Sequence, residues 1–358
     1  MAADEPRFAP LLQPAVDNHT LAGAVLLVAD KDRTLAVETV GYADIGANKP
    51  MRADNLFWIA SQSKPITAAA LMMLVDEGKV KLDDPVEKYL PEFKTLWLAT
   101  ERDADHVLLQ KPSHPITVRN VLSHTSGLPF KSALEEPTLD LFPLEARVRS
   151  YAMTPLGFDP DGGYQYSNAG INTAGRIIEV ASGMSYEDFL DKRLFEPLGM
   201  KDTTFWPGEE QLGRLAKSYK QNAAKDGLEA ITIGQLKYPL DDRRRQPMPA
   251  GGLFSTASDV ARFCQMVLNG GAFEGRRYLS EDSVREMTKR QTPETVKENY
   301  GLGWGTGGGV FGHGGAFATN MSIDSGLGLI TVYMVQHAGP PEVGQLHGVF
   351  VNAAREAF

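Results

Sequence analysis

Residues 60–67 read Ala-Ser-Gln-Ser-Lys-Pro-Ile-Thr and run directly into the apolar stretch 68–75. This pattern is typical of an α-helix, because a proline at position 65 is tolerated only near a helix start. A spacing of three residues then places Ser61 and Lys64 on one helical face, with Cβ atoms about 5 to 6 Å apart. A serine hydroxyl is a weak nucleophile, and a lysine can activate it when burial lowers the lysine pKa. The stretch therefore predicts Ser61 as a nucleophile and Lys64 as its base.

The same spacing also occurs wherever a helix-capping serine precedes a surface lysine, so the chemistry needs further groups. A glycine-rich turn at 161–163 precedes Tyr-Gln-Tyr-Ser-Asn at 164–168, a loop from which side chains can point into a cleft. The phenol of Tyr166 can pass protons if a lysine lies close, and the amide of Asn168 can hold both that lysine and a substrate carbonyl. Without such neighbours, Tyr166 would be an ordinary half-buried tyrosine.

Residues 312–316 read Gly-His-Gly-Gly-Ala and lie just before the C-terminal strands. Small residues at a strand edge let a backbone N–H group approach a reacting carbonyl closely, which can complete an oxyanion hole. Taken alone, His313 is more typical of a structural histidine, and the glycines are more typical of a turn.

Hydrophobic periodicity divides the chain into two α/β ends and a mainly helical middle. Residues 8–19 are predicted to form a helix, followed by strands at 24–28 and 34–40. Near the other end, strands are predicted at 321–323 and 329–335, and a helix at 348–358. The helices predicted between the ends span 66–77, 118–123, 171–181, 186–194 and 257–268.

The composition is that of a folded, enzyme-sized protein, with 358 residues, 42% of them hydrophobic and 23% charged. A net charge of −9 leaves no basic surplus for phosphate groups, so nucleic acid is not an expected partner. The single cysteine, Cys264, excludes an internal disulfide. The stretch 68–75 is too short for the ~20 apolar residues of a membrane helix, so no membrane insertion is expected. The alanines at positions 2 and 3 weakly favour a periplasmic or exported protein with its signal peptide removed, and the cytoplasm is the alternative.

Three other chemistries lack their sequence signatures. The G-x-S-x-G pentapeptide of the α/β-hydrolases does not occur. Residues 303–308 match G-x-G-x-x-G but precede no predicted helix, so we expect a sheet turn there and no nucleotide site. The histidines show no metal-ligand spacing with carboxylates, so neither a metal nor a cofactor is expected. The oligomeric state, monomer or dimer, stays open.

The order Ser-x-x-Lys, Tyr-x-Asn and His-Gly-Gly resembles the β-lactamase-like serine hydrolases over nearly the whole chain. That family contains class C β-lactamases, penicillin-binding DD-peptidases, D-aminopeptidases and family VIII carboxylesterases. The resemblance implies an α/β (α+β) fold in which an antiparallel sheet is flanked by N- and C-terminal helices. Residues 1–75 and 293–358 would form the sheet domain and residues 76–292 a mainly helical inserted domain, with the active site in the cleft between them. Supporting stretches are 122–128, 197–200, 250–256 and 300–304.

The same resemblance implies a role for each motif residue. Ser61 would be acylated, Lys64 and Tyr166 would transfer protons, and Asn168 would orient the substrate. The backbone N–H groups of Ser61 and Ala316 would hold the oxyanion. The remaining substrate-binding positions would be His313, Gly314 and Gly315.

The chain departs from the family pattern at two of these positions. His313 stands where β-lactamases and DD-peptidases usually carry a lysine, and Gly314 stands in place of a threonine or serine. A lysine with a hydroxyl beside it would bind the carboxylate of a β-lactam or of a D-peptide, whereas histidine is only partly charged and glycine has no hydroxyl. The departure favours a carboxylesterase acting on small neutral esters. The alternatives are a β-lactamase, a D-amino-acid peptidase or amidase, and a sensor or scaffold without turnover.

Overall fold

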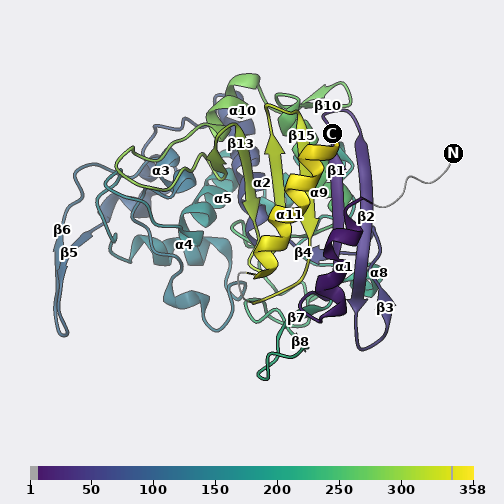
Figure 1. Ribbon diagram of the computed structural model, residues 1–358. Helices are drawn as coiled ribbons and strands as arrows, with labels where there is room; N and C mark the ends of the chain where they lie inside the picture. Colours follow the sequence, from purple (N-terminus) through teal and green to yellow (C-terminus); the bar gives the residue numbers. More distant parts are fainter. Residues whose placement is uncertain (1–6, 340–341) are drawn as a thin grey trace.

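A seven-stranded antiparallel sheet organises the fold, and the computed structural model describes residues 7–339 and 342–358 (Figure 1). The order of the strands is β12-β13-β14-β15-β1-β2-β3. Strand β1 pairs with β15, Val25 lying opposite Met334, so the two ends of the chain share one sheet, as predicted. The strands are β1 (Gly23–Ala29), β2 (Thr34–Asp44), β3 (Lys49–Pro50), β12 (Gly305–Gly307), β13 (Val310–Gly314), β14 (Asn320–Asp324) and β15 (Leu329–Met334).

Helices α1 (Ala9–Asp17) and α11 (Glu342–Ala357) cover one face of the sheet, where they lie beside each other (Figure 1). Phe8 packs edge-on against Phe350 at 5.5 Å between ring centroids, and both side chains are buried. Helix α11 begins at residue 342, which is six residues before the start of the helix predicted at 348–358. Its first turns contain glycines at 344 and 348, which weaken the sequence signal of a helix.

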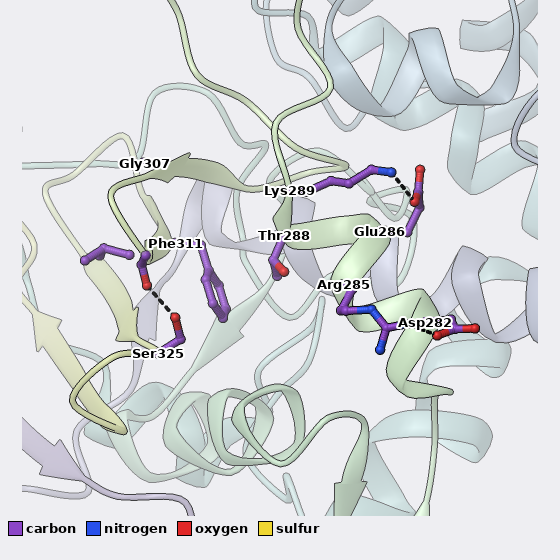
Figure 2. A pocket seen from close by; sticks show the side chains of 10 residues that line it. Asp282, Arg285, Glu286, Thr288, Lys289, Gly307, Phe311 and Ser325 are labelled. Atoms are coloured by element: carbon purple, nitrogen blue, oxygen red, sulfur yellow. Dashed lines mark hydrogen bonds and ion pairs between the residues drawn. The ribbon is translucent and has the colours of Figure 1, made fainter.

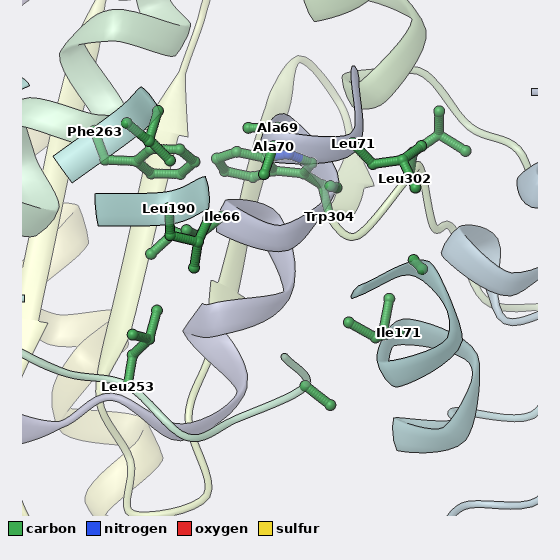
Figure 3. Packing of buried hydrophobic residues seen from close by; sticks show 14 of the residues in the cluster. Ile66, Ala69, Ala70, Leu71, Ile171, Leu190, Leu253, Phe263, Leu302 and Trp304 are labelled. Carbon is green, nitrogen blue, oxygen red and sulfur yellow. The ribbon is translucent and has the colours of Figure 1, made fainter. Parts of the chain in front are cut away.

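Helices α2 (Ser63–Asp76) and α9 (Ala257–Leu268) form the layer on the other face. Figure 3 shows the packing there, with the ring of Phe263 stacked on that of Trp304 at 5.9 Å and the small side chains of Ala69 and Ala70 close by. Residues 63–74 of α2 are all buried, because this helix runs between the sheet and the helical part of the molecule. A helix that is buried all round places even its lysine in the interior.

The helical part matches the predicted limits at residues 118–123 and departs from them at residues 186–194. The helix at 118–123 has the predicted limits, because Thr117 caps its start by accepting from the Asn120 amide. The helix predicted at 186–194 is α-helical only as far as Leu190, and the chain continues as a π-helical turn, Asp191–Phe195. The helices here are α3 (Val118–Ser123), α4 (Leu144–Ala152), α5 (Asn168–Ser182), α6 (Tyr186–Leu190), α7 (Glu196–Leu198), α8 (Glu209–Arg214) and α10 (Glu281–Thr288).

The middle of the chain also contains short strands that periodicity did not predict. Most are exposed or only two residues long, so they lack the alternation of buried and exposed side chains that marks a strand in sequence. Four two-stranded sheets result: β4 (Phe57–Trp58) with β9 (Phe254–Ser255), β5 (Leu98–Arg102) with β6 (Val107–Gln110), β7 (Ser218–Gln221) with β8 (Leu228–Ile231), and β10 (Ala272–Phe273) with β11 (Arg276–Arg277).

One large cluster of buried apolar side chains joins the sheet to the helical part, from Leu27 in β1 to Ile171 in α5. Helix α9 lies within the predicted insertion 76–292, yet it packs on β1, β14 and β15. The division into two domains stays a prediction, and the packing of α9 places that helix with the sheet.

Candidate active site

Ser61 lies in a single 3-10 turn, Ala60–Gln62, that leads into α2. The sequence placed it on the first turn of the helix, and the tighter turn keeps the expected neighbour relation to Lys64. Ala60 adopts a φ of +46°, a left-handed conformation that L residues other than glycine rarely adopt. Such backbone strain persists only where the surrounding structure holds it in place, and it is common at functional sites.

The amine of Lys64 has three polar neighbours. Its Nζ lies 3.0 Å from Ser61 Oγ, 2.9 Å from Asn168 Oδ1 and 2.8 Å from the carbonyl oxygen of Ala250. The side chain is fully buried and forms no ion pair with a described residue, so burial holds the pKa of Lys64 well below its ordinary value. Because the two carbonyl oxygens can only accept, a neutral amine donates to both and directs its lone pair at the Ser61 hydroxyl.

Tyr166 precedes α5, whose start is fixed by Ser167, since the Ser167 hydroxyl accepts from the Gly170 amide at 2.9 Å. Lys64 Nζ lies 4.6 Å from the centroid of the Tyr166 ring, so the predicted base and the predicted proton carrier are adjacent. Burial raises the pKa of Tyr166, and hydrogen bonding to Ser61 partly opposes this rise. Tyr166 is therefore a neutral phenol that has a proton to give.

Two contacts fix the tautomer of His313, and burial keeps the ring neutral. Its Nδ1 lies 2.7 Å from the Gly314 carbonyl oxygen, so this nitrogen carries the proton. Its Nε2 lies 2.9 Å from the hydroxyl of Tyr300, which donates to it, and 3.5 Å from the hydroxyl of Tyr166. Burial, with the nearby Lys64, lowers the pKa of His313 to about 3. The sequence predicted a partly charged histidine, and the structure corrects this to a neutral one.

A second histidine lies behind Tyr166. The ring of His124 lies 4.6 Å from the ring of Tyr166 and 4.6 Å from that of Tyr300, and burial holds its pKa well below the ordinary value. Sequence reasoning did not assign a role to either His124 or Tyr300. Both lie in stretches that supported the family resemblance, at 122–128 and 300–304, which is the signal that could have identified them.

Two backbone N–H groups are the candidates for the predicted oxyanion hole. Those of Ser61 and Ala316 donate to no other described residue. Both residues line one cavity, and Gly315 passes close to Ile59, since a β-carbon at Gly315 would lie 2.6 Å from the Ile59 carbonyl oxygen, a distance that only glycine allows. The end of β13 can thus approach the turn that carries Ser61, as an oxyanion hole requires.

A cavity of about 300 Å³ surrounds Ser61. The structure brings Ser61, Tyr166, Asn168, Gly314, Gly315 and Ala316 together in its lining, while Lys64 and His313 lie behind that lining. None of the side chains that line this cavity carries a charge. The lining residues that sequence reasoning did not assign are Trp58, Ala60, Phe130, Gln235, Met248, Ala250 and Gly251.

A larger cavity of about 620 Å³ lies between α10 and the β12–β13 turn, and its charged groups are occupied by one another (Figure 2). Lys289 pairs with Glu286 at 2.6 Å, and Arg285 pairs with Asp282. This cavity offers no free charge or nucleophile near Ser61. Across residues 7–339 and 342–358, no group of His, Cys, Asp and Glu side chains is placed to hold a metal ion. No helix in the same ranges is long and apolar enough to cross a membrane.

The fold and the site define a serine hydrolase in which a lysine and a tyrosine lie beside the predicted nucleophile. The chain belongs to the beta-lactamase family, whose family model matches residues 8–355. Protein MT1414 of Mycobacterium tuberculosis (strain CDC 1551 / Oshkosh) is 31% identical to it, over 91% of this chain and 88% of its own. Esterase EstB of Burkholderia gladioli is 28% identical, over 93% of this chain and 90% of its own. The solved structure of EstCE1, a hydrolase with promiscuous acyltransferase activity, matches with a TM-score of 0.80 at 23% identity, covering 97% of each chain, which is a likeness of fold.

Proposed function

We propose that this protein is a carboxylesterase that hydrolyses small neutral esters through an acyl-enzyme on Ser61. One observation carries the proposal: the cavity around Ser61 is lined without a charged side chain, and His313 beside it is neutral. A substrate carboxylate would lose its hydration there without meeting a cation, which costs several kcal/mol, whereas a neutral ester loses little.

In the acylation step, the Ser61 oxygen attacks the ester carbonyl carbon and its proton passes to the neutral amine of Lys64, 3.0 Å away. The N–H groups of Ser61 and Ala316 stabilise the oxyanion that forms. Tyr166 gives its proton to the leaving oxygen as the bond between carbonyl carbon and leaving oxygen breaks, and it regains a proton from Lys64. The products of this step are the free alcohol and an ester of Ser61.

The second step repeats the first with water in place of the alcohol. Water loses a proton to the same Lys64 and Tyr166 pair, attacks the acyl carbon and releases the acid, while the proton returns to the Ser61 oxygen. Asn168 supports both steps, because its Oδ1 holds Lys64 and its amide nitrogen is left free to donate to a carbonyl oxygen of the substrate.

The name of one similar protein supports the ester class, since EstB is described as an esterase. The alternative within the family is hydrolysis of β-lactams or D-peptides, as relatives described as D-alanyl-D-alanine-carboxypeptidases suggest. That alternative needs a cation for the substrate carboxylate, and neither His313 nor Gly314 supplies one.

The first experiment compares turnover of p-nitrophenyl butyrate with turnover of a chromogenic cephalosporin. We expect ester hydrolysis that disappears in Ser61→Ala, with cephalosporin turnover at least about a hundredfold lower in kcat/KM. Ser325→Ala, at the charged cavity of Figure 2, is the matched serine control and should keep wild-type activity. Efficient cephalosporin turnover with negligible ester turnover would refute the carboxylesterase, and an inert wild type would refute the enzyme altogether.

A second experiment restores the missing cation. His313→Lys combined with Gly314→Thr should strengthen binding of carboxylate-bearing β-lactams by about tenfold, measured as acylation of Ser61 by mass spectrometry. A threonine at position 314 fits, because a β-carbon there meets its nearest neighbour, Asn320 Nδ2, only at 3.4 Å. Unchanged acylation would remove the role that we give to these two positions.

A further inference from the structure

A second cavity adjoins the one around Ser61, on the sheet face that α11 covers. Its volume is about 410 Å³, and it shares Tyr166 and Gly314 with the cavity around Ser61. We call it the glycine trough. Glycines at 305, 312 and 314 form its floor, and Asn320, Ser322 and His347 form its wall.

The floor is flat because three strand positions that face the same way are glycines. Gly305 lies opposite Gly312 in the β12–β13 pair, and Gly314 follows two residues along the strand. A β-carbon at Gly312 would collide with the backbone of Met321, so packing requires that glycine. At Gly305 and Gly314 the nearest atoms would lie 3.4 Å away, so a small side chain would fit there. The glycines at these two positions keep space open that packing alone does not demand.

The wall carries unused polar groups. Asn320 lies opposite Gly314 and Ser322 opposite Gly312, so both side chains stand beside the floor. His347 comes from α11 and lies 5.6 Å from the ring of Tyr333. The Asn320 amide, the Ser322 hydroxyl and His347 Nε2 bond to no other described residue. Burial lowers the pKa of His347 to about 4, so near pH 7 the wall is polar but carries no charge.

The position of the trough relates it to one part of the substrate. The oxyanion donor Ala316 follows Gly314 by two residues, so the reacting carbonyl lies at the end of β13 where the trough begins. The leaving oxygen must lie beside Tyr166 to receive its proton, and Tyr166 lines the trough. The alcohol part of the ester is therefore the part that can extend over Gly314.

We propose that the glycine trough binds the leaving alcohol, and that Asn320, Ser322 and His347 select alcohols with free hydroxyl groups, such as a glycerol or sugar unit. The inference rests on the proposed esterase function, because only an ester has such a leaving group. Each polar group on the wall can pair with a substrate hydroxyl, and an alcohol without hydroxyls leaves these groups unpaired.

The test uses two esters with the same acyl group and the same three-carbon alcohol skeleton: 2,3-dihydroxypropyl butyrate and n-propyl butyrate. We expect wild-type kcat/KM to favour the dihydroxypropyl ester by about tenfold, and Asn320→Leu to remove about five- to tenfold of that preference with the propyl ester nearly unchanged. Ser322→Ala, a smaller change, should reduce the preference in the same direction. Asn299→Leu makes the same chemical change in an exposed loop outside the trough and should keep the wild-type ratio.

Deacylation separates this inference from the proposed function. Both esters give the same butyryl-enzyme, and so does p-nitrophenyl butyrate, whose release of p-nitrophenol reports acylation. The slower phase that follows the burst of p-nitrophenol measures deacylation, and its rate should be the same in Asn320→Leu and wild type. Turnover of both esters without preference, or an equal loss on both in Asn320→Leu, overturns the trough alone. Absence of any turnover in the wild type overturns the esterase and the trough together.

Discussion

At the scale of single residues, the reactivity of Ser61 depends on what surrounds the Lys64 amine. The Asn168 amide oxygen and the Ala250 carbonyl oxygen each accept a hydrogen bond from that amine and can donate none to it. Full burial without a carboxylate partner then favours the neutral amine, whose lone pair faces the hydroxyl. The base is therefore prepared before substrate binds.

This arrangement predicts a pH profile. The pKa of Lys64 lies well below its ordinary value and that of Tyr166 above its own, so both are in the reactive state over a wide range. We expect kcat/KM for p-nitrophenyl butyrate to fall only on the acid side, as Lys64 gains a proton, and to stay level up to about pH 9. A rise of about tenfold per pH unit up to pH 9 would instead indicate an ordinary lysine.

Gly315 predicts a steric effect on the oxyanion hole. In Gly315→Ala, the new β-carbon would lie 2.6 Å from the Ile59 carbonyl oxygen and would also strike Thr319, so the end of β13 must move away from Ser61. The misplaced Ala316 N–H should lower kcat by about 10²- to 10³-fold. Gly307→Ala, on the neighbouring strand with only one atom at 3.9 Å, is the control and should keep its activity. Equal activity in both variants would contradict this geometry.

Tyr300 predicts a positioning effect that acts through His313. Tyr300→Phe removes the hydroxyl that donates to His313 Nε2 at 2.9 Å, so Tyr166, at 3.5 Å, becomes the nearest donor to that nitrogen. A Tyr166 hydroxyl turned toward His313 is withdrawn from the leaving group, and kcat should fall about tenfold with KM little changed. Tyr164→Phe, in the same aromatic cluster, is the control, because its hydroxyl makes no hydrogen bond with a described residue. A loss expressed in KM alone would assign Tyr300 to substrate binding.

At the scale of elements, helix α11 packs on the sheet through contacts that include a histidine that resists protonation. His347 lies against Tyr333 of β15, and burial lowers its pKa to about 4. The unfolded chain binds this proton near pH 6.5 and the folded chain only near pH 4. The stability associated with neutral His347 is therefore complete above about pH 6.5 and is lost as the pH falls toward 4.

The corresponding prediction compares variants across pH. Between pH 7 and about pH 4.5, the free energy of unfolding should fall by about 2 kcal/mol less in His347→Gln than in the wild type. Urea denaturation at both pH values measures this difference. His106→Gln, at an exposed histidine, should follow the wild type. The same pH dependence in all three proteins would show that His347 does not resist protonation.

At the scale of the whole molecule, segments from opposite ends of the chain pair in the sheet and pack together on one of its faces. Phe8 precedes α1 and Phe350 belongs to α11, and their buried rings meet in an apolar cluster that contains none of the residues lining the cavity around Ser61. Phe350 also lies 6.3 Å from Tyr333. This contact therefore contributes to stability without touching the active site.

Phe350→Ala should lower the free energy of unfolding by about 3 to 5 kcal/mol, the usual cost of removing a fully buried phenylalanine. Its neighbour Val349 is 43% exposed, and Val349→Ala should cost less than about 1 kcal/mol. Urea denaturation measures both values, and esterase activity below the unfolding transition should persist in both. A small cost at Phe350 would mean that the two ends of the chain are not coupled.

The sequence by itself determined what depends on short-range spacing. The three-residue interval brought Ser61 to Lys64, and the helices at 118–123 and 257–268 have the predicted limits. Cap residues and local periodicity settle such features, because they act over a few residues. The exposed β5–β6 hairpin has no such local signal.

Only the tertiary structure decided the protonation states and the shape of the site. The Ala250 carbonyl oxygen accepts from Lys64 across 186 residues of sequence, and the Tyr300 hydroxyl donates to His313 Nε2. The glycine trough needs β12, β13, β14 and α11 together. Burial and hydrogen bonding to distant groups set a pKa and a cavity, and no stretch of sequence contains either, because both arise only when separate segments exclude water from the same place.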